Sequence, residues 1–565
     1  EAVPLLFTEV ASQLGIDYTH QENEFVDFKV QPLLPHMHSK NGPGIAVSDV
    51  NADGLEDFYI GGASNHSGAL YLQQGNGKFK KGTTTGIDSV ADDMGVLLFD
   101  ADGDGDADLY VASGGSEHVK GSDLYKDELY MNDGKGNFRK VMNALPEVQQ
   151  SGSGVVAADY DRDGDLDLFV GGRIVPGEYP LPADSYLFRN DSDKTACRFT
   201  NVTEAVAPGF IKLGLVTSAL WTDVDNDGWV DLMIVGEFMP ITCYKNNEGK
   251  TFTPLAKESL GHTSGWWNSL TGGDFDNDGD TDYIAGNLGL NTRYRGNRKE
   301  PLCIYASDYD KNGSVDPVMT YYLQGTKHIV HARDELISQI SAMRLRFRKY
   351  EEYADATFDQ SFLPAELEPA YVVCSEWFET SYVENMGEGK FSVKALPIES
   401  QFSTVFGVVA RDYNHDDNLD VVMVGNFYAS DVNTGRYDAS VGLFLRGDGK
   451  GNFQASKAKE CGLFTDDDAK GMADLTVGTE RMLLLVGNNG GAAKAFEVAQ
   501  QYKNYQPDSD DAFALVTLAN GKTFRHEFYY GSTYLSQSSR TLRYSGSVVR
   551  IEVYNFSGER KEIAL

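Results

Sequence analysis

The chain has few of the features that membrane spans, zinc motifs and nucleic-acid binding require. No apolar run among its 565 residues reaches the roughly 18 residues of a transmembrane helix. Its five cysteines (Cys197, Cys243, Cys303, Cys374, Cys461) are far apart and form no CxxC pair, so we expect mainly buried free thiols. Only 49 basic residues stand against 84 acidic ones, and the net charge of −35 argues against a nucleic-acid partner.

Proline is also scarce, with 17 residues against 59 glycines. Many glycine-rich turns between short apolar segments are typical of an all-β repeat fold. The chain begins at Glu1 without a basic or apolar leader, so any export signal is expected to be absent or already removed.

The most informative stretch is the acidic loop between Asp159 and Asp167. Aspartates stand at positions 1, 3, 5 and 9 of nine residues, with Gly164 at position 6 and a β-prone segment after it. A tight loop of this kind supplies the oxygens, about six to eight in number, that Ca²⁺ takes. Position 7 would add its backbone carbonyl, and glycine permits the sharp bend.

The loop recurs along most of the chain, which predicts up to seven Ca²⁺ sites. An EF-hand is excluded because position 12 is apolar rather than Glu and strands, not helices, flank each loop. Magnesium suits an all-carboxylate cage less well. We expect the metal to stabilise each turn rather than to be sensed. The predicted ligands are Asp49, Asn51, Asp53 and Asp57; Asp100, Asp102, Asp104 and Asp108; Asp159, Asp161, Asp163 and Asp167; Asp223, Asp225, Asp227 and Asp231; Asp274, Asp276, Asp278 and Asp282; Asp308, Asp310, Asn312 and Asp316; and Asp412, Asn414, Asp416 and Asp420.

A second repeated piece, aromatic–Asn/Gly turn–aromatic, follows most loops, as in residues 130–138 and 244–252. Together the two pieces predict four antiparallel strands every 50–64 residues, which is a β-propeller blade. We expect eight blades, the last with a degenerate loop at Asp474. Seven is the alternative if the short Asp308 unit merges with its neighbour.

The predicted propeller spans residues 1–500, and a small β domain spans 501–565. The segment beginning at Phe7 is similar to the fourth strand of other units, so we expect it to close the ring. The 104 residues from Asp308 to Asp412 imply an insertion at about 324–380. Its apolar spacing at Leu336, Ile337, Ile340 and Met343 predicts a helix.

These motifs resemble a known family. The loops resemble the FG-GAP or VCBS repeats of integrin-like propellers, and residues 529–540 resemble the core of the ASPIC/UnbV domain. With Gly265-Trp-Trp-Asn268 and Gly435-Arg-Tyr-Asp438, the whole chain resembles VCBS-repeat surface lipoproteins of Bacteroidota. Cartilage acidic proteins share this two-domain plan. One departure is Leu542-Arg-Tyr-Ser-Gly546, where the family usually has Phe-Gly-Leu-Gly.

Strand direction separates two faces of the predicted ring. The metal loops and Gly turns share one face, so the other face carries the 2–3 and 4–1 connections and the insertion. Unusual residues in those connections form a candidate site for a glycan or peptide, although the tryptophans could equally pack between blades. They are Trp266, Trp267, Asn268, Asn291, Arg293, Tyr428, Arg436, Tyr437 and Asp438.

Catalytic motifs such as GxSxG and HExxH are absent from the sequence. The pairs His36/His38 and His328/His331 have no acid or Cys ligand in register beside them. The resemblance implies a non-catalytic, calcium-stabilised lipoprotein, exported to the cell surface and anchored to the outer membrane by lipid upstream of Glu1. It would be an accessory of a SusCD-type nutrient-uptake complex; a periplasmic or secreted protein is the alternative location.

Two other functions stay open. One is a calcium-dependent, lyase-like polysaccharide enzyme using Arg293 or Arg436. The other is a scaffold whose insertion binds a partner protein.

Overall fold

Short antiparallel sheets make up most of the structure. The computed structural model describes residues 5–565 except 85, 88, 89, 194 and 256. The first three sheets follow the chain in simple order, each strand pairing with the next. They contain β2 (Ile45–Ser48), β3 (Asp57–Ile60), β4 (Ala69–Gln73) and β5 (Phe79–Lys81); β6 (Asp92–Phe99), β7 (Asp108–Gly114), β8 (Glu128–Met131) and β9 (Arg139–Lys140); and β10 (Ser151–Ala158), β11 (Asp167–Ile174), β12 (Tyr186–Asn190) and β13 (Phe199–Asn201).

Four further sheets have the same plan, although two of them draw on distant segments. They contain β14 (Leu215–Thr222), β15 (Asp231–Met239), β16 (Thr242–Asn246) and β17 (Phe252–Leu255), with β18 (Gly265–Trp266) beside β15; β19 (Ser269–Gly273), β20 (Asp282–Gly286), β25 (Ser381–Asn385) and β26 (Phe391–Ala395); β27 (Gly407–Arg411), β28 (Asp420–Val424), β29 (Leu443–Gly447) and β30 (Phe453–Ser456); and β31 (Ala469–Val477), β32 (Arg481–Asn488), β33 (Lys494–Gln501) and β1 (Phe7–Glu9).

These sheets are the blades of a closed ring, numbered 1–7 in the order given. Their first strands contact each other in the sequence β2, β6, β10, β14, β19, β27, β31 and back to β2. In blade 7 the N-terminal β1 pairs with β33, with Phe7 opposite Val498. The fold is therefore an all-β propeller, and within the described residues it has seven blades, the alternative count, rather than eight.

The count differs because the Asp308 unit builds no blade. Its hairpin belongs to a separate sheet of order β23-β22-β21-β24, inserted between the second and third strands of blade 5. This insertion domain starts earlier than predicted and combines strands with short helices. It contains β21 (Leu302–Ser307), β22 (Asp316–Leu323), β23 (Thr326–Ile329), α4 (Arg333–Gln339), α5 (Met343–Arg346), α6 (Tyr350–Ala354), α7 (Phe358–Ser361), α8 (Pro364–Leu367) and β24 (Tyr371–Ser375).

The insertion domain has its own apolar core, in which Leu336, Ile340 and Met343 of the predicted helical segment are buried. A disulfide joins Cys303 to Cys374 across β21 and β24. The expectation of free thiols is therefore wrong for these two residues, while Cys197, Cys243 and Cys461 are free. The sequence did not reveal the pair because 71 residues separate the two cysteines.

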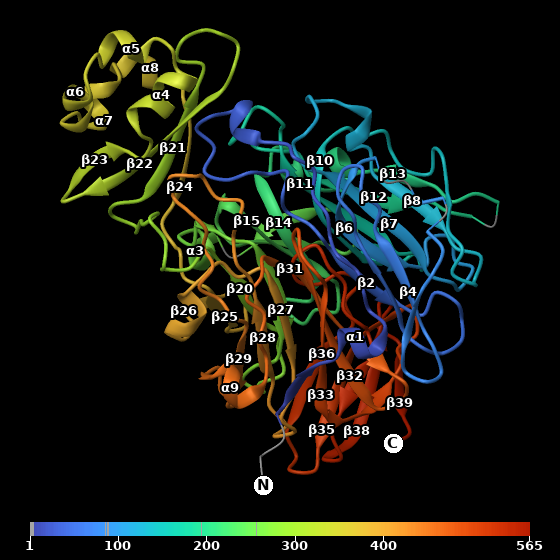
Figure 1. Cartoon of the computed structure of the whole chain (residues 1–565). Helices are drawn as coiled ribbons and strands as arrows, with labels where there is room; N and C mark the ends of the chain where they lie inside the picture. Colours follow the sequence, from blue (N-terminus) through green and yellow to red (C-terminus); the bar gives the residue numbers. More distant parts are fainter. Residues whose placement is uncertain (1–4, 85, 88–89, 194, 256) are drawn as a thin grey trace.

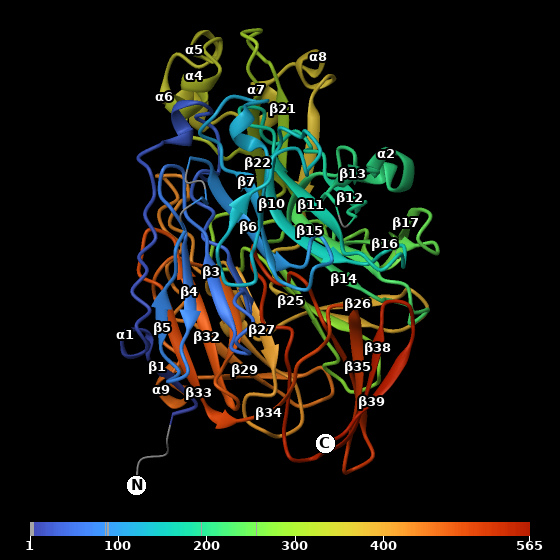
Figure 2. The ribbon, with the colours of Figure 1, turned by 90° about the vertical axis from the view of Figure 1, so that its right-hand side faces the viewer.

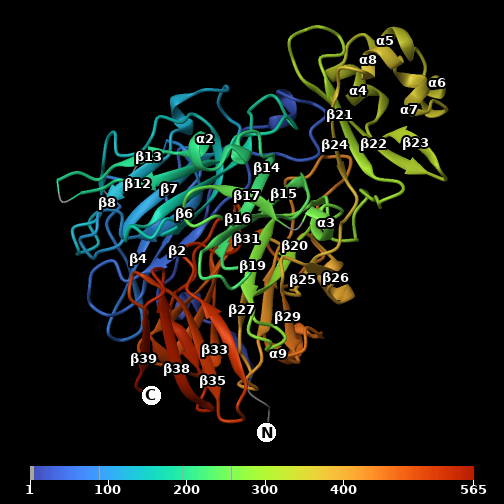
Figure 3. The same cartoon turned by 180° about the vertical axis from the view of Figure 1, so that it is seen from behind.

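The C-terminal residues form a sheet of order β36-β35-β38-β39 and a small ladder of β34 with β37. Figures 1, 2 and 3 show this sheet and the insertion domain at opposite ends of the propeller. The remaining elements are β34 (Lys503–Tyr505), β35 (Asp511–Leu518), β36 (Thr523–Glu527), β37 (Leu542–Tyr544), β38 (Val548–Asn555), β39 (Arg560–Ile563), α1 (Ala11–Leu14), α2 (Thr203–Val206), α3 (Lys257–Leu260), α9 (Ala458–Cys461), η1 (Asp27–Lys29), η2 (Asp123–Tyr125), η3 (Pro208–Phe210) and η4 (Ile398–Gln401).

Between β36 and β37 the chain enters the centre of the ring. This axial segment, residues 530–539, bonds to the first strand of each of the seven blades, and its Thr533 and Gln537 are buried. The partners are Ile45, Val96, Ala157, Ser218, Leu270, Val408 and Asp474. The axis of the ring is therefore filled by the protein itself.

Candidate metal sites

The seven acidic loops share one backbone conformation. In each, the position-9 aspartate begins the second strand and pairs with the residue just before position 1, as Ala158 does with Asp167. Position 6 has a positive φ in every loop, for example 101° at Gly164 and 66° at Asp417. Asp417 thus adopts the left-handed conformation that the turn requires at position 6, where the other loops have glycine. Six loops connect blade strands, and the Asp308 loop connects β21 to β22 of the insertion domain.

The aspartates at positions 1 and 9 organise each turn. Asp159 accepts the N–H groups of Asp163 and Gly164, at 3.1 Å each. Asp167, which is fully buried, accepts the N–H of Tyr160 at 3.2 Å and that of Asn190 at 2.8 Å. These bonds hold the carboxylates around one point, so the turn is organised for a cation by its own backbone.

The position-3 aspartates leave an oxygen free to bind such a cation. Among the described residues, five of them each have one buried carboxylate oxygen without a hydrogen-bond partner. An unpaired buried carboxylate is costly, and a hard cation satisfies it. The ligand atoms of several loops also lie within 4.8 Å of one another. The five residues are Asp102, Asp161, Asp225, Asp276 and Asp310.

The electrostatics favour a cation for the same reason. Burial, followed by neighbouring carboxylates, raises the pKa of Asp108 and of Asp282 to about 8 and that of Asp274 to about 7. Without a counter-charge the ionised loops are therefore unfavourable at neutral pH. The donor set, made only of oxygen, fits a hard divalent cation.

One of the seven loops differs because cationic side chains reach its carboxylates. In the loop at Asp223, Lys245 contacts Asp225 and lies 2.8 Å from Asp227. Arg525 of the C-terminal sheet lies 3.2 Å from Asp223. These cations would compete with a metal for the same oxygens, so we expect this loop to depend on a metal less than the other six.

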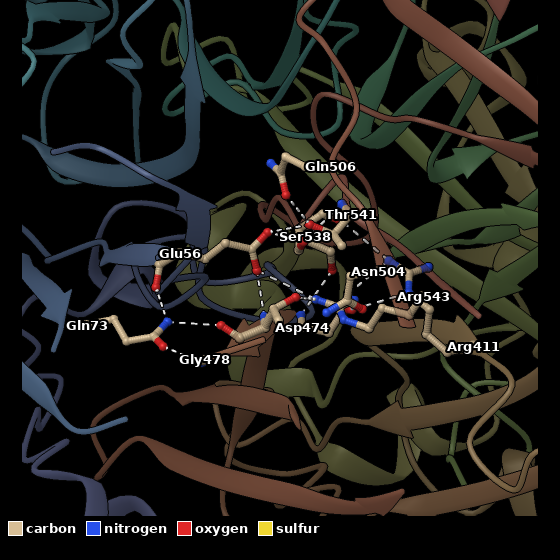
Figure 4. Close-up of polar contacts among 12 residues, drawn as sticks. Glu56, Gln73, Arg411, Asp474, Gly478, Asn504, Gln506, Ser538, Thr541 and Arg543 are labelled. Carbon is tan, nitrogen blue, oxygen red and sulfur yellow. Dashed lines mark hydrogen bonds and ion pairs between the residues drawn. The ribbon is translucent and has the colours of Figure 1, made fainter. Parts of the chain in front are cut away.

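In blade 7 two arginines neutralise a buried aspartate of the first strand (Figure 4). The buried Asp474, predicted to begin a degenerate loop, instead lies inside β31 opposite Leu484, because this strand continues to Val477. It accepts a bidentate pair of bonds from Arg411 at 3.0 and 3.2 Å. Arg543, from β37, also binds Asp474 and lies 3.6 Å from Glu56 of blade 1. The C-terminal domain thus docks on blade 7 through an arginine that pairs with a buried aspartate of this blade.

The C-terminal domain covers the loop face. Its Ser545 and Ser547 donate to Asp417, and the Arg525 N–H donates to Asp274 at 3.1 Å. A cavity of about 320 Å³ remains between the first two loops and the chain around Gln506 and Arg540. The loop face is therefore largely an internal docking surface.

The predicted ligand-binding residues divide into two groups on the opposite face. Trp266, Trp267 and Asn268 are buried; the Trp267 indole donates to the Thr263 carbonyl at 2.8 Å. Asn291 donates to the carbonyl of Phe402 at 3.1 Å.

The second group lies near the surface, where connections of blades 5 and 6 meet. Arg293 donates to Thr434 at 3.2 Å and to the Val330 carbonyl of the insertion domain at 2.9 Å. Arg436 lies over the ring of Tyr428 at 4.7 Å, and Thr292 donates to Tyr437. Arg436 and Asp438 are exposed. The structure thus brings Arg293, Tyr428, Arg436, Tyr437 and Asp438 to one region, while the tryptophans lie in the interior.

Sequence reasoning missed a set of asparagines that link the loops to the next blade. They end the third strands or, in the case of Asn132, directly follow one, and they stand in the repeated aromatic–Asn segment, which was interpreted only as a turn. Each donates to the position-2 carbonyl of the preceding loop. The pairs are Asn132 with Val50, Asn190 with Ala101, Asn246 with Tyr160 and Asn385 with Val224.

Comparison with known proteins agrees with a repeat propeller. A model of the FG-GAP-like repeat matches residues 49–111, 118–170 and 223–285. Cartilage acidic protein 1 of Xenopus tropicalis is 29% identical over 217 residues, 37% of this chain and 31% of that protein. The mouse protein is 26% identical over 219 residues, covering 37% and 31%. The chain thus contains FG-GAP-like repeats and spans about a third of the length of these relatives.

Solved structures give only distant similarities. The Vibrio cholerae biofilm matrix protein Bap1 has 10% identity and a TM-score of 0.37, with 93% of this chain and 99% of Bap1 covered. Saccharomyces cerevisiae Sqt1 has 12% identity and a TM-score of 0.38, with 82% and 97% covered. Among the described residues no helix is long and apolar enough to cross a membrane.

Proposed function

We propose that the protein is a non-catalytic, calcium-stabilised binding and scaffold protein displayed on the cell surface. Its acidic loops would hold up to seven Ca²⁺ ions, which neutralise the buried carboxylates and stiffen each turn. The unpaired position-3 oxygens and the all-oxygen donor sets support this choice of ion.

The observation that carries the scaffold role is the apolar surface of the insertion domain. Leu345 of α5 is 76% exposed and Leu363, just before α8, is 60% exposed, although both belong to segments anchored by a buried core. Figure 1 shows these elements projecting from the end opposite the C-terminal sheet. Exposed apolar side chains on a rigid projection suit a protein partner.

The partner we propose is a SusCD-type outer-membrane uptake complex, with the chain exported and held by lipid upstream of Glu1. The family resemblance supports this setting. A glycan or peptide ligand would bind beside the insertion domain, at Arg293, Tyr428, Arg436, Tyr437 and Asp438. Two arginines, two aromatic rings and a carboxylate suit a polar ligand.

A pull-down from native membranes tests the scaffold role. The double variant Leu345→Glu/Leu363→Glu should lose partners that the unaltered protein retains. Val549→Glu, at a 55% exposed valine on the C-terminal sheet, is the matched control and should retain them. Identical partners for the double variant and the control would contradict the proposal.

A further inference from the structure

A buried polar cluster lies in the ring on the side opposite the metal loops. The N-terminal segment 31–43 crosses this face and bonds to blade 6: the Met37 N–H donates to the Ala429 carbonyl at 2.8 Å. The crossing brings His36 and His38 inside, each 1% exposed, with ring centroids 4.3 Å apart. Glu237, on β15 of blade 4, lies beside them and is also 1% exposed.

We propose that His36, His38 and Glu237 form a binding site for a divalent transition metal of the zinc class. One ligand atom from each lies within 4.8 Å of the others. His36 Nε2 is 3.1 Å from both oxygens of Glu237. In a tetrahedral zinc site the N···O separation is roughly 3.4 Å, so only a small adjustment separates this geometry from a metal-bound one.

The hydrogen bonds of His36 favour the ligand tautomer. Its Nδ1 is 3.1 Å from the Met37 carbonyl, which can only accept, so Nδ1 carries a proton. Nε2 then directs its lone pair at a carboxylate that is also an acceptor. A positive centre between the two groups satisfies both: either a proton, which makes His36 an imidazolium paired with Glu237, or a bound metal, for which the carbonyl behind the ring orients the imidazole.

His38 is an independent indication of a ligand. Within the part of the chain that the structure describes, neither of its ring nitrogens has a hydrogen-bond partner. A fully buried imidazole without partners loses the solvation of both nitrogens. Coordination through one of them removes part of that cost.

The carboxylate is held in place by two donors. Arg173 Nη2 lies 2.7 Å from Oε2 of Glu237, and the Tyr179 hydroxyl lies 2.5 Å from Oε1. Each oxygen keeps a lone pair on the side facing His36. The positive charge of Arg173 opposes any cation, so it selects against an ion held by charge alone, such as Ca²⁺, and for one that bonds strongly to nitrogen.

Metal analysis of the full chain tests this site. Protein produced with added Zn²⁺ is dialysed against Ca²⁺, which saturates the acidic loops, and its zinc is measured by mass spectrometry. We expect a single retained zinc ion. His38→Leu should lower the zinc content roughly tenfold or more. It should still fold, because the ring of His38 makes no hydrogen bond that leucine would lose.

His262→Gln is the control, since His262 is 59% exposed and its neighbouring carboxylate is Glu376 rather than Glu237. A second readout is the visible absorption of Co²⁺-loaded protein, whose intensity distinguishes a four-coordinate site from six-coordinate oxygen sites such as the acidic loops. Zinc retained equally by the unaltered protein and by His38→Leu would overturn the proposal. So would an unaltered protein that holds no zinc after dialysis.

Discussion

The Asn246 side chain donates to the carbonyl oxygen of Tyr160 at 2.8 Å and to that of Val230 at 3.1 Å. Tyr160 is the second residue of the acidic loop of blade 3, whereas Asn246 ends the third strand of blade 4. One amide therefore ties a candidate metal loop to the neighbouring blade. Three other blade pairs are joined in the same way. The conformation of the loop is thereby coupled to the contact between neighbouring blades.

Replacing this amide should destabilise the ring. Asn246→Ala leaves the buried carbonyl of Tyr160 without its donor, and each unsatisfied buried group costs about 1–3 kcal/mol. Urea unfolding in excess Ca²⁺ measures the loss. Lys250→Ala, at an exposed residue of the same hairpin, is the control and should change little. Equal stabilities of the two variants would show that the bond contributes nothing.

Removing calcium should lower the melting temperature. Chelation leaves the buried carboxylates of the loops without a counter-charge, and added Ca²⁺ should restore stability more effectively than Mg²⁺. Asp161→Asn should reduce the stabilisation by Ca²⁺ more than Asp225→Asn does, because Lys245 already neutralises carboxylates of the loop that contains Asp225. Differential scanning fluorimetry reports both effects. A melting temperature insensitive to chelator would contradict the structural role of the metal.

The ion pairs of Arg411 and Arg543 with Asp474 should stabilise the protein whether or not a metal is present. Arg543→Met removes one partner of the fully buried Asp474, and breaking such a pair costs about 3–5 kcal/mol. The loss should be the same with Ca²⁺ and with chelator. Arg550→Met, at a half-exposed arginine of the same domain, serves as the control. A loss that Ca²⁺ reverses would instead indicate a metal bound at Asp474.

His331 should make the protein sensitive to mild acid. Burial, followed by the charge of Arg293, lowers its pKa to about 3, and its Nε2 accepts the Met319 N–H at 3.1 Å. Because the unfolded chain binds this proton near pH 6.5, stability falls as the pH decreases from 6.5 towards 3, by about 1.4 kcal/mol per unit.

His331→Gln keeps an acceptor but cannot be protonated, so it should lose about 2 kcal/mol less than the unaltered protein between pH 7.5 and pH 5.0. Urea unfolding at the two pH values measures this. His262→Gln should behave as the unaltered protein. If His331→Gln shows the same acid loss, His331 is not the group responsible.

The sequence was informative where structure is set by local spacing. The Asp-x-Asp-x-Asp-Gly pattern predicted the loops, their left-handed position 6 and the strands around them, because each depends on about nine neighbouring residues. The same reasoning assigned the Asp308 loop to a blade. The loop there is genuine, but whether its strands join the ring depends on distant partners such as β24.

Contacts between residues far apart in the sequence could not be predicted, because they do not follow from local spacing. The bond between His36 and Glu237 spans 201 residues, and that between Leu98 and Gln537 spans 439. Only the closure of the ring brings such residues together. The buried tryptophans show a second limit of sequence analysis. Two adjacent aromatic residues look the same in a sequence whether they pack in a core or line a binding site.

The axial segment has a consequence for the order in which the molecule is made. Residues 530–539 touch all seven first strands, yet they are translated after every one of them. Blade 7 likewise waits for its last strands to meet β1, the earliest strand of the chain. The centre of the ring is therefore completed only after all seven blades have been translated, and a chain truncated before residue 530 has blades without an axial segment.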